Sequence, residues 1–401
     1  MATNPVGMIL NAPTLVNHVA APFGVQSFSY LPSFGILSTH PPTPCGLATF
    51  SAALARGLST RGADVSVVRI ADGTPSEHAH IVGEHVNGSA PSVIATSDLL
   101  NRSDVAVIQH EYGIYGGPDG DEVVDVMTGL NVPSIVVAHT VLKDPTPQQR
   151  SVLEEVVARA DQVVVMSEAA RRRLCTGFGV DKTKIITIPH GAALPTTAAL
   201  KRSGRPTILT WGLLGPGKGI ERVIDAMASL KDLPHSPRYL IAGRTHPKVL
   251  AAQGDTYREG LIAQAQRLGV ADSVSFDAAY RTPEALTALM QAASVVVLPY
   301  DSRDQVTSGV LVDSIASGRP VVATAFPHAV ELLGSGAGTV VGHDDPDALV
   351  AALRRLLTDP RVAGSMASEA RDLAPAMAWP VVANAYLTLG QRLVAARLAA
   401  A

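Results

Sequence analysis

VVVLPYDSRDQVTSGVLVDSIASGRPVVAT, residues 295–324, is the stretch from which the fold of this chain is best predicted. It indicates a buried strand at Val295–Leu298, a polar loop over 300–307, a helix over 308–316 and a second strand at Val321–Thr324. Both strands are β-branched and continuously apolar, which is typical of a parallel sheet covered on both faces. The stretch therefore predicts a βαβ unit in an open α/β sheet.

The junction between the loop and the helix is a candidate binding site. The free N–H groups at the predicted helix start belong to Ser308, Gly309 and Val310, and such a place favours an anion or sugar hydroxyls. Gly309 has no Cβ, so a ligand could approach the backbone there. Asp313, about a turn further on, can direct its carboxylate to the same pocket. The alternative is an ordinary βαβ unit with a polar loop.

Length and composition predict two domains and argue against several classes of protein. The chain has 401 residues, 47% hydrophobic and 17% charged, with a net charge of −3 that gives no support for binding to nucleic acid. Its two cysteines, Cys45 and Cys175, form no CxxC pair, which favours a cytoplasmic setting and argues against a zinc site. No apolar run approaches the ~18 residues of a transmembrane helix.

The chain alternates predicted strands and helices in two series, from about residue 34 to 188 and from 208 to 324. Residues 1–30 contain no charged side chain and lack the basic start of a signal peptide, so they are predicted as an irregular extension. In the first series, His110 with Glu111, His139 and His190 each follow a predicted strand. Because ligands of open α/β sheets bind at the carboxyl edge, these residues are predicted to line a cleft.

Five motifs, in this order, resemble those of the retaining family-4 glycosyltransferases. They are PPTPCG (41–46), IPHGA (188–192), GLLGPGKGIERVIDAM (212–227), SGVLVDSIASGRPVVAT (308–324) and DDPDALVAALRRLL (344–357). The likeness covers most of the chain and implies the α/β GT-B fold, two facing Rossmann-like domains with an interdomain cleft. It implies an N-terminal acceptor domain over 31–195, a linker over 196–206, a nucleotide-sugar domain over 207–379 and a C-terminal helix, 380–401, that returns to the first domain.

The resemblance also implies roles for individual residues. The catalytic set is His139, Lys218 and Gln305. The donor-binding set is Gly46, Gly212, Gly217, Lys218, Arg244, Ser308, Gly309, Val310 and Asp313. The acceptor side of the cleft has His110, Glu111 and His190, and no residue is assigned to a metal. In such an enzyme lysine and helix N-termini, instead of a metal, stabilise the charge that develops on the departing diphosphate.

The chain departs from the family pattern in three places. The paired glutamates of the family fall on Gln305 and Asp313. Leu213 stands where an arginine is expected beside the lysine, and Arg244 is a candidate to compensate. His190 stands where the family has an asparagine before glycine. These changes bear on the donor and on turnover, and leave the predicted fold unchanged.

The sequence favours one function and leaves two alternatives open. GLLGPGKG fits the start of a P-loop, but Gly219 follows the lysine where a Ser or Thr would bind magnesium. The favoured function is metal-independent, cofactor-free transfer of a glucose- or mannose-type hexosyl group, with retention, from a nucleotide-diphosphate sugar to an unidentified hydroxyl on a saccharide or lipid-linked acceptor. A nucleotide-sugar epimerase and a catalytically weak nucleotide-sugar-binding module are the alternatives. Peripheral contact with a membrane stays open.

Overall fold

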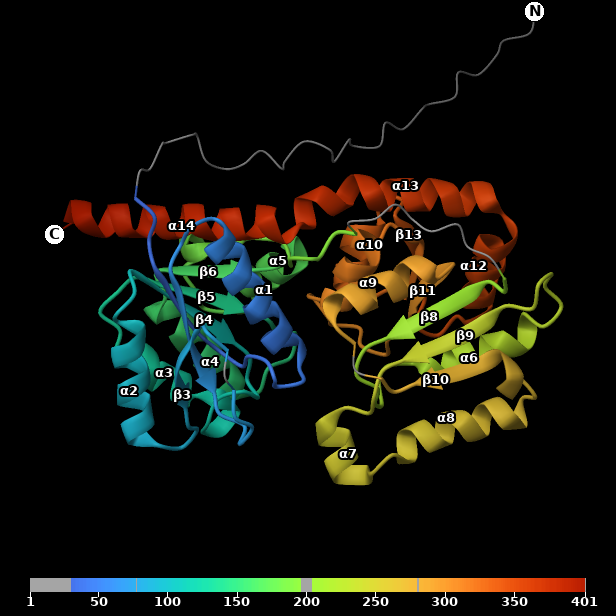
Figure 1. Cartoon of the computed structure of the whole chain (residues 1–401), viewed down its shortest axis with the longest axis horizontal. Coiled ribbons are helices and arrows are strands. Elements are labelled where there is room, and N and C mark those ends of the chain that lie inside the picture. The colour runs from blue at the N-terminus through green and yellow to red at the C-terminus, as the bar shows by residue number, and fades with distance from the viewer. Residues whose placement is uncertain (1–29, 77, 196–203, 280, 401) are drawn as a thin grey trace, which may run out of the picture.

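The computed structural model describes residues 30–76, 78–195, 204–279 and 281–400. Its N-terminal and C-terminal halves form two α/β units that lie side by side (Figure 1). Each unit is a parallel sheet with helices on both faces, so the predicted pair of Rossmann-like domains is confirmed. The predicted extension, 1–30, and the predicted linker, 196–206, lie largely outside the described residues.

The sheet of the N-terminal domain has seven parallel strands in the order β3-β2-β1-β4-β5-β6-β7. Its strands are β1 (Phe34–Ser38), β2 (Val65–Ile70), β3 (Ile81–His85), β4 (Val105–His110), β5 (Ser134–Ala138), β6 (Gln162–Val165) and β7 (Ile185–Thr187). The chain runs outward in both directions from the neighbours β1 and β4. Their carboxyl ends form the switch point at which ligands of such sheets bind.

The C-terminal sheet repeats this plan with six parallel strands in the order β10-β9-β8-β11-β12-β13. Its strands are β8 (Thr207–Trp211), β9 (Arg238–Ala242), β10 (Val274–Asp277), β11 (Val295–Leu298), β12 (Val321–Thr324) and β13 (Gly338–Val341). Every residue of β11 and β12 is buried, as expected for β-branched strands covered on both sides. The switch point lies between β8 and β11, which carry the glycine-rich and the donor motifs.

Helices cover both faces of each sheet. Those of the N-terminal half are α1 (Gly46–Thr60), α2 (Ala90–Leu100), α3 (Glu122–Thr128), α4 (Pro147–Arg159) and α5 (Glu168–Gly177). Those of the C-terminal half are α6 (Ile220–Ser229), α7 (Pro247–Gln253), α8 (Thr256–Arg267), α9 (Pro283–Ala292), α10 (Gly309–Ala316), α11 (Pro327–Leu333), α12 (Pro346–Thr358), α13 (Pro360–Met377) and α14 (Trp379–Ala400). Side-chain caps fix many of the starts, such as the capping box of Thr146 and Gln149 before α4.

The hydrophobic core divides into four clusters, one on each face of each sheet. Ile36 and Leu37, neighbours in β1, belong to different clusters because successive strand residues point to opposite faces. Helices α6, α8 and α12 cover one face of the C-terminal sheet, and α9, α10, α11 and α13 cover the other. Helix α14 packs on α1 of the N-terminal domain, so the predicted return of the C-terminal helix is confirmed (Figure 1).

The chain passes between the domains twice, at adjacent points. Ala192 pairs with Ala378, through hydrogen bonds from Ala192 N to Met377 O (2.8 Å) and from Trp379 N to Ala192 O (3.1 Å). The ring of Trp379 lies 2.4 Å from where a Cβ on Gly191 would be, so only glycine fits there. The IPHGA motif therefore lies against the break between α13 and α14.

Several elements differ from the sequence predictions. Strand β3 and helix α2, together with α7, α11 and β13, were not predicted from the sequence. Pro375 lies inside α13, which ends at Met377 with Ala378 as its C-cap. Of the helices that the structure describes, none has both the length and the apolar character needed to span a membrane.

Candidate active site

The glycine-rich segment after β8 and the loop after β11 fit together at the switch point. Gly219 has φ 64°, and a Cβ there would lie 1.8 Å from Pro299 O, so this close approach requires glycine. The packing places Lys218 beside the second loop, with its Nζ 4.5 Å from the centre of the Tyr300 ring. The two motifs that the sequence linked to the donor are thus joined in one site.

Lys218 is a cation held in the protein without an opposite charge. Within the described residues its Nζ forms no ion pair, and it lies over the face of the Tyr300 ring. Burial lowers the pKa of Lys218, because desolvation disfavours the charged ammonium. An anionic ligand at this position would supply the missing charge.

A second cation, which the sequence did not single out, lies in the first turn of α6, four residues after Lys218. Arg222 pairs with Asp301 (2.7 Å), while its Nη1 is buried without a partner in the described part of the chain. Leu213 had drawn attention to the missing arginine, and an arginine four residues after Lys218 was the available signal. Arg244, the predicted substitute, is exposed in the loop after β9, and its carbonyl accepts the N–H of Leu214 (2.9 Å).

The start of α10 differs from the prediction. Ser308 caps the helix, and its hydroxyl accepts the N–H of Leu311 (3.2 Å). The expectation of a free N–H on Ser308 is wrong, because that group donates to Nδ1 of His328 (2.9 Å). His328 lies 20 residues further along the sequence, so no local pattern could reveal the bond.

The expected open approach to Gly309 is occupied by His190 of the interdomain motif. A Cβ on Gly309 would lie only 2.8 Å from His190 Nε2. The glycine is required by this contact across the domain boundary and not by a ligand at that point. Val310 instead faces the glycine-rich segment, with its Cγ2 3.8 Å from where a Cβ on Gly212 would lie.

Asp313 retains the features expected of a ligand-binding carboxylate. Its carboxyl accepts no hydrogen bond from any residue that the structure describes, and burial raises its pKa to about 7. Hydrogen bonds from ligand hydroxyls would stabilise the ionised form. Gln305, the other substituted position, folds back on its own loop and donates from Nε2 to Thr307 O (2.9 Å).

On the N-terminal side, His139 is held in one tautomer. Its Nε2 lies 2.6 Å from Oε1 of Gln109, which can only accept, so the proton is on Nε2 and Nδ1 is free to accept. Burial and the neighbouring His190 lower the pKa of His139 to about 3, so the ring is neutral. Both His139 and His190 lie edge-on to Phe50 of α1, with ring centroids 5.0 Å apart in each case.

The other predicted cleft residues have different environments. His110 is 1% exposed, burial lowers its pKa to about 4, and its Nδ1 has no partner among the described residues. Glu111 accepts a hydrogen bond from Thr140, and burial raises its pKa. From the C-terminal domain, Lys248 of α7 reaches the same loop, with its Nζ 3.3 Å from where a Cβ on Gly113 would lie. His110 is therefore placed as a buried core group, and Glu111 as the more accessible of the pair.

The glycine loop before α1 is fixed by a buried arginine that the sequence analysis did not single out. Arg69 is fully buried, and its five N–H groups all donate to protein acceptors: His40 O, Thr74 O, Glu84 Oε1, Thr43 Oγ1 and Asp72 Oδ1. Gly46, the first residue of α1, would meet no described atom within 4 Å if it carried a Cβ. The loop is thus rigid while space remains at the helix start.

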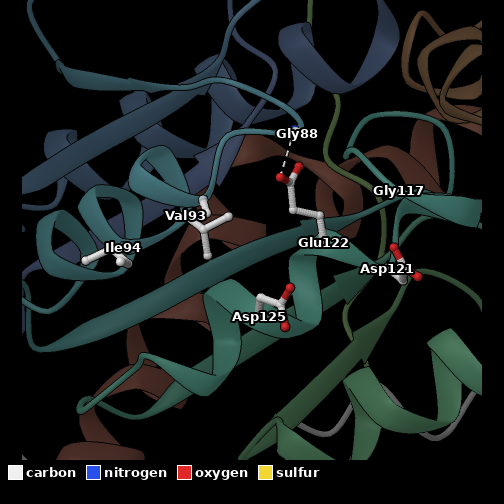
Figure 2. A pocket seen from close by; sticks show the side chains of 8 residues that line it. Gly88, Val93, Ile94, Gly117, Asp121, Glu122 and Asp125 are labelled. Atoms are coloured by element: carbon white, nitrogen blue, oxygen red, sulfur yellow. Dashed lines mark hydrogen bonds between the residues drawn. The ribbon is translucent and has the colours of Figure 1, made fainter.

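A separate groove lies away from these residues, between α2 and α3 of the N-terminal domain (Figure 2). It is lined by Gly88, Ala90, Val93, Ile94, Gly117, Asp121, Glu122 and Asp125. Glu122 is engaged by the protein itself, since it accepts the N–H of Gly88 (2.8 Å), as Figure 2 shows. None of the predicted site residues lines this groove.

Family models match both domains of the chain. The model described as Glycosyltransferase Family 4 matches residues 44–194, and that described as Glycosyl transferases group 1 matches residues 197–373. The chain belongs to the family-4 glycosyltransferases. The family-4 membership predicted from the five motifs is therefore confirmed.

Curated relatives of this glycosyltransferase include two D-inositol 3-phosphate glycosyltransferases. The protein of Segniliparus rotundus is 28% identical over 282 residues, which cover 64% of this chain and 60% of the relative. That of Kineococcus radiotolerans is 29% identical over 306 residues, covering 67% and 68%. The match thus spans about three fifths to two thirds of these relatives.

Solved structures agree on the fold. A glycosyltransferase from Rickettsia africae superposes with a TM-score of 0.72 at 14% identity, covering 90% of this chain and 99% of that one. The Anabaena protein HepE, solved with UDP-glucose, gives a TM-score of 0.67 at 18% identity, covering 92% and 100%. At these identities the likeness establishes the GT-B architecture alone.

Proposed function

We propose that this glycosyltransferase moves a hexosyl group, with retention, from a nucleotide-diphosphate sugar to a hydroxyl of an acceptor, without a metal or cofactor. The observation that carries the proposal is Lys218, a desolvated ammonium without a protein counter-charge, in the same site as the unpartnered carboxyl of Asp313. A diphosphate and a ribose supply the two missing partners. That the curated relatives are named as glycosyltransferases, and that HepE was solved with UDP-glucose, supports this choice of donor.

The donor half of the reaction follows from these charges. The bond between the anomeric carbon and a diphosphate oxygen breaks, and negative charge collects on the diphosphate. Lys218 stabilises that charge in a site of low polarity, where an aimed cation lowers a barrier more than in water. The hydroxyls of the ribose donate to Asp313, which holds the nucleotide for the reaction.

The acceptor half follows from the N-terminal edge. With retention, the acceptor oxygen bonds to the anomeric carbon on the face from which the diphosphate leaves, and its proton passes to a diphosphate oxygen. His139 is neutral, with Nδ1 open to accept a sugar hydroxyl, so it orients and does not deprotonate. We assign Glu111 to the acceptor side, where Lys248 provides a positive charge near its carboxyl.

The setting and partners form part of the same proposal. A cytoplasmic location fits the two free thiols, Cys45 and Cys175. The acceptor is a saccharide, a polyol or a lipid-linked sugar, and the names of the relatives make D-inositol 3-phosphate the first to try. The positive charge that such a mechanism needs comes from Lys218 and neighbouring cations, so we propose that no metal takes part.

One experiment separates transfer from its alternatives. The protein is incubated with UDP-glucose, ADP-glucose and GDP-mannose, with and without D-inositol 3-phosphate or simple saccharides, and nucleoside diphosphate and sugar products are measured. Acceptor-dependent release of diphosphate with an α-linked product supports the proposal. An epimerised sugar without an acceptor would make the protein an epimerase, and binding without any product would leave a binding module.

A further inference from the structure

One of the contacts between the two domains is made by a carboxylate of α11. Glu331 of α11, in the C-terminal domain, accepts the N–H of Glu168 (3.0 Å) on one oxygen and that of Ala169 (2.7 Å) on the other. These are the first free N–H groups of α5, a ten-residue helix of the N-terminal domain. A helix N-terminus attracts negative charge, and here a residue 163 positions away provides it.

The same helix end holds the loop that carries Gln305. Ser167, the N-cap of α5, donates from its hydroxyl to Val306 O (2.6 Å), and Arg173 donates to Asp304 O (2.6 Å). The Val306 side chain is only 4% exposed and belongs to the core cluster of the N-terminal domain. The loop is therefore part of one domain by sequence and docked on the other by packing.

Helix α11 connects these contacts to the donor site. Nδ1 of the His328 ring accepts the backbone N–H of Ser308 (2.9 Å), and the backbone N–H of His328 donates to Gln305 O (3.2 Å). Glu331 follows His328 by three residues, about one turn, on the same helix. Helix α11 thus binds the loop through His328 and the N-terminal domain through Glu331.

We propose that Glu331 is a positioning residue, which couples closure of the two domains to the placement of the 304–308 loop. When the domains separate, the Glu331, Ser167 and Arg173 bonds break together and Val306 leaves its pocket. The loop then loses its support from the N-terminal domain, and Gln305 and the start of α10 are no longer held at the reacting sugar. This role rests on the proposed function, because it places the loop for donor chemistry.

Hydrogen exchange of the protein without ligand tests the coupling independently of turnover. In Glu331→Ala, the amides of Glu168, Ala169 and Ser308 should exchange about tenfold faster or more, the scale of losing a charge-assisted bond at a helix end. Glu331→Gln keeps an acceptor oxygen and should show a smaller change. Glu259→Ala, an exposed first-turn glutamate on α8, is the matched control and should leave these amides unchanged.

Kinetics and scattering complete the test. With UDP-glucose as donor, Glu331→Ala should lower kcat about tenfold or more while the dissociation constant for UDP changes less than threefold, and small-angle scattering should show a larger radius of gyration. Unchanged exchange at Ser308 together with an unchanged radius would overturn the coupling. Because exchange and scattering need no substrate, a failure of the proposed transferase activity would show separately, as absent turnover in the unmodified protein.

Discussion

Replacing Lys218 by methionine removes the charge and keeps most of the side-chain volume. The ammonium is partly desolvated over Tyr300 and has no counter-charge within the described residues. Loss of the cation–π contact costs about 0.5–2 kcal/mol, and relief of the desolvated charge offsets it. The thermal midpoint should therefore stay within a few degrees of that of the unmodified protein, or rise.

The rate of glycosyl transfer, unlike the thermal midpoint, should change strongly in Lys218→Met. Loss of one group that stabilises the departing diphosphate raises the barrier by ~2–4 kcal/mol, so kcat with the active donor should fall roughly 30- to 1,000-fold. Initial rates of diphosphate release at saturating donor measure this, with Lys182→Met, an exposed lysine of the N-terminal domain, as control. A wild-type kcat in a folded Lys218→Met protein would refute the assigned role.

Three further predictions concern the same cleft. Asp313→Asn should weaken nucleotide binding and raise stability near neutral pH, since burial lifts the pKa of this carboxyl to about 7 and its ionisation opposes folding. The affinity of the unmodified protein for its donor should rise as the pH increases through about 7, because Asp313 becomes ionised. If Asp313→Asn bound the donor as tightly as the wild-type protein, Asp313 could not be the group that binds the ribose. Gly309→Ala should disturb domain closure by its clash with His190, and His190→Ala should rescue it, as measured by scattering; the absence of rescue would contradict the contact. His110 and His328 are both 1% exposed, and burial lowers their pKa to about 4 and about 3. The free energy of unfolding should therefore fall as the pH drops below 6.5, by ~2 kcal/mol for each histidine at about pH 5. Equal free energies of unfolding from denaturant titrations at pH 7.5 and pH 5 would contradict this.

The sequence predicted the structure best at positions where burial restricts the choice of residue. Strands such as Val295–Leu298 are apolar at every position because helices cover both faces of the sheet, so their pattern predicts them without further information. Strand β3 (Ile81–His85) lies at the edge of its sheet and is only partly buried, so its residues carry no such constraint and it was missed. Glycines with a packing reason, such as Gly219, also appear in the sequence as a motif.

The contacts between the domains could not be predicted from the sequence, for a physical reason. Glu331 meets α5 across 163 residues, and neither partner has an unusual local pattern. His328 holds Ser308 from another helix, and Gly309 is required by His190 instead of by a ligand. Motifs placed the loops at one edge of the sheets, but which groups satisfy one another there depends on how two separately folded units meet.

We infer that the C-terminal domain binds an activated sugar between the loop of Lys218 and the helix of Asp313. A crystal structure of the protein soaked with the nucleotide sugar that it turns over tests this most directly. The diphosphate should lie within hydrogen-bonding distance of Lys218 Nζ, and a ribose hydroxyl should donate to the Asp313 carboxylate. A nucleotide bound in another pocket, with both of these groups unoccupied, would contradict it.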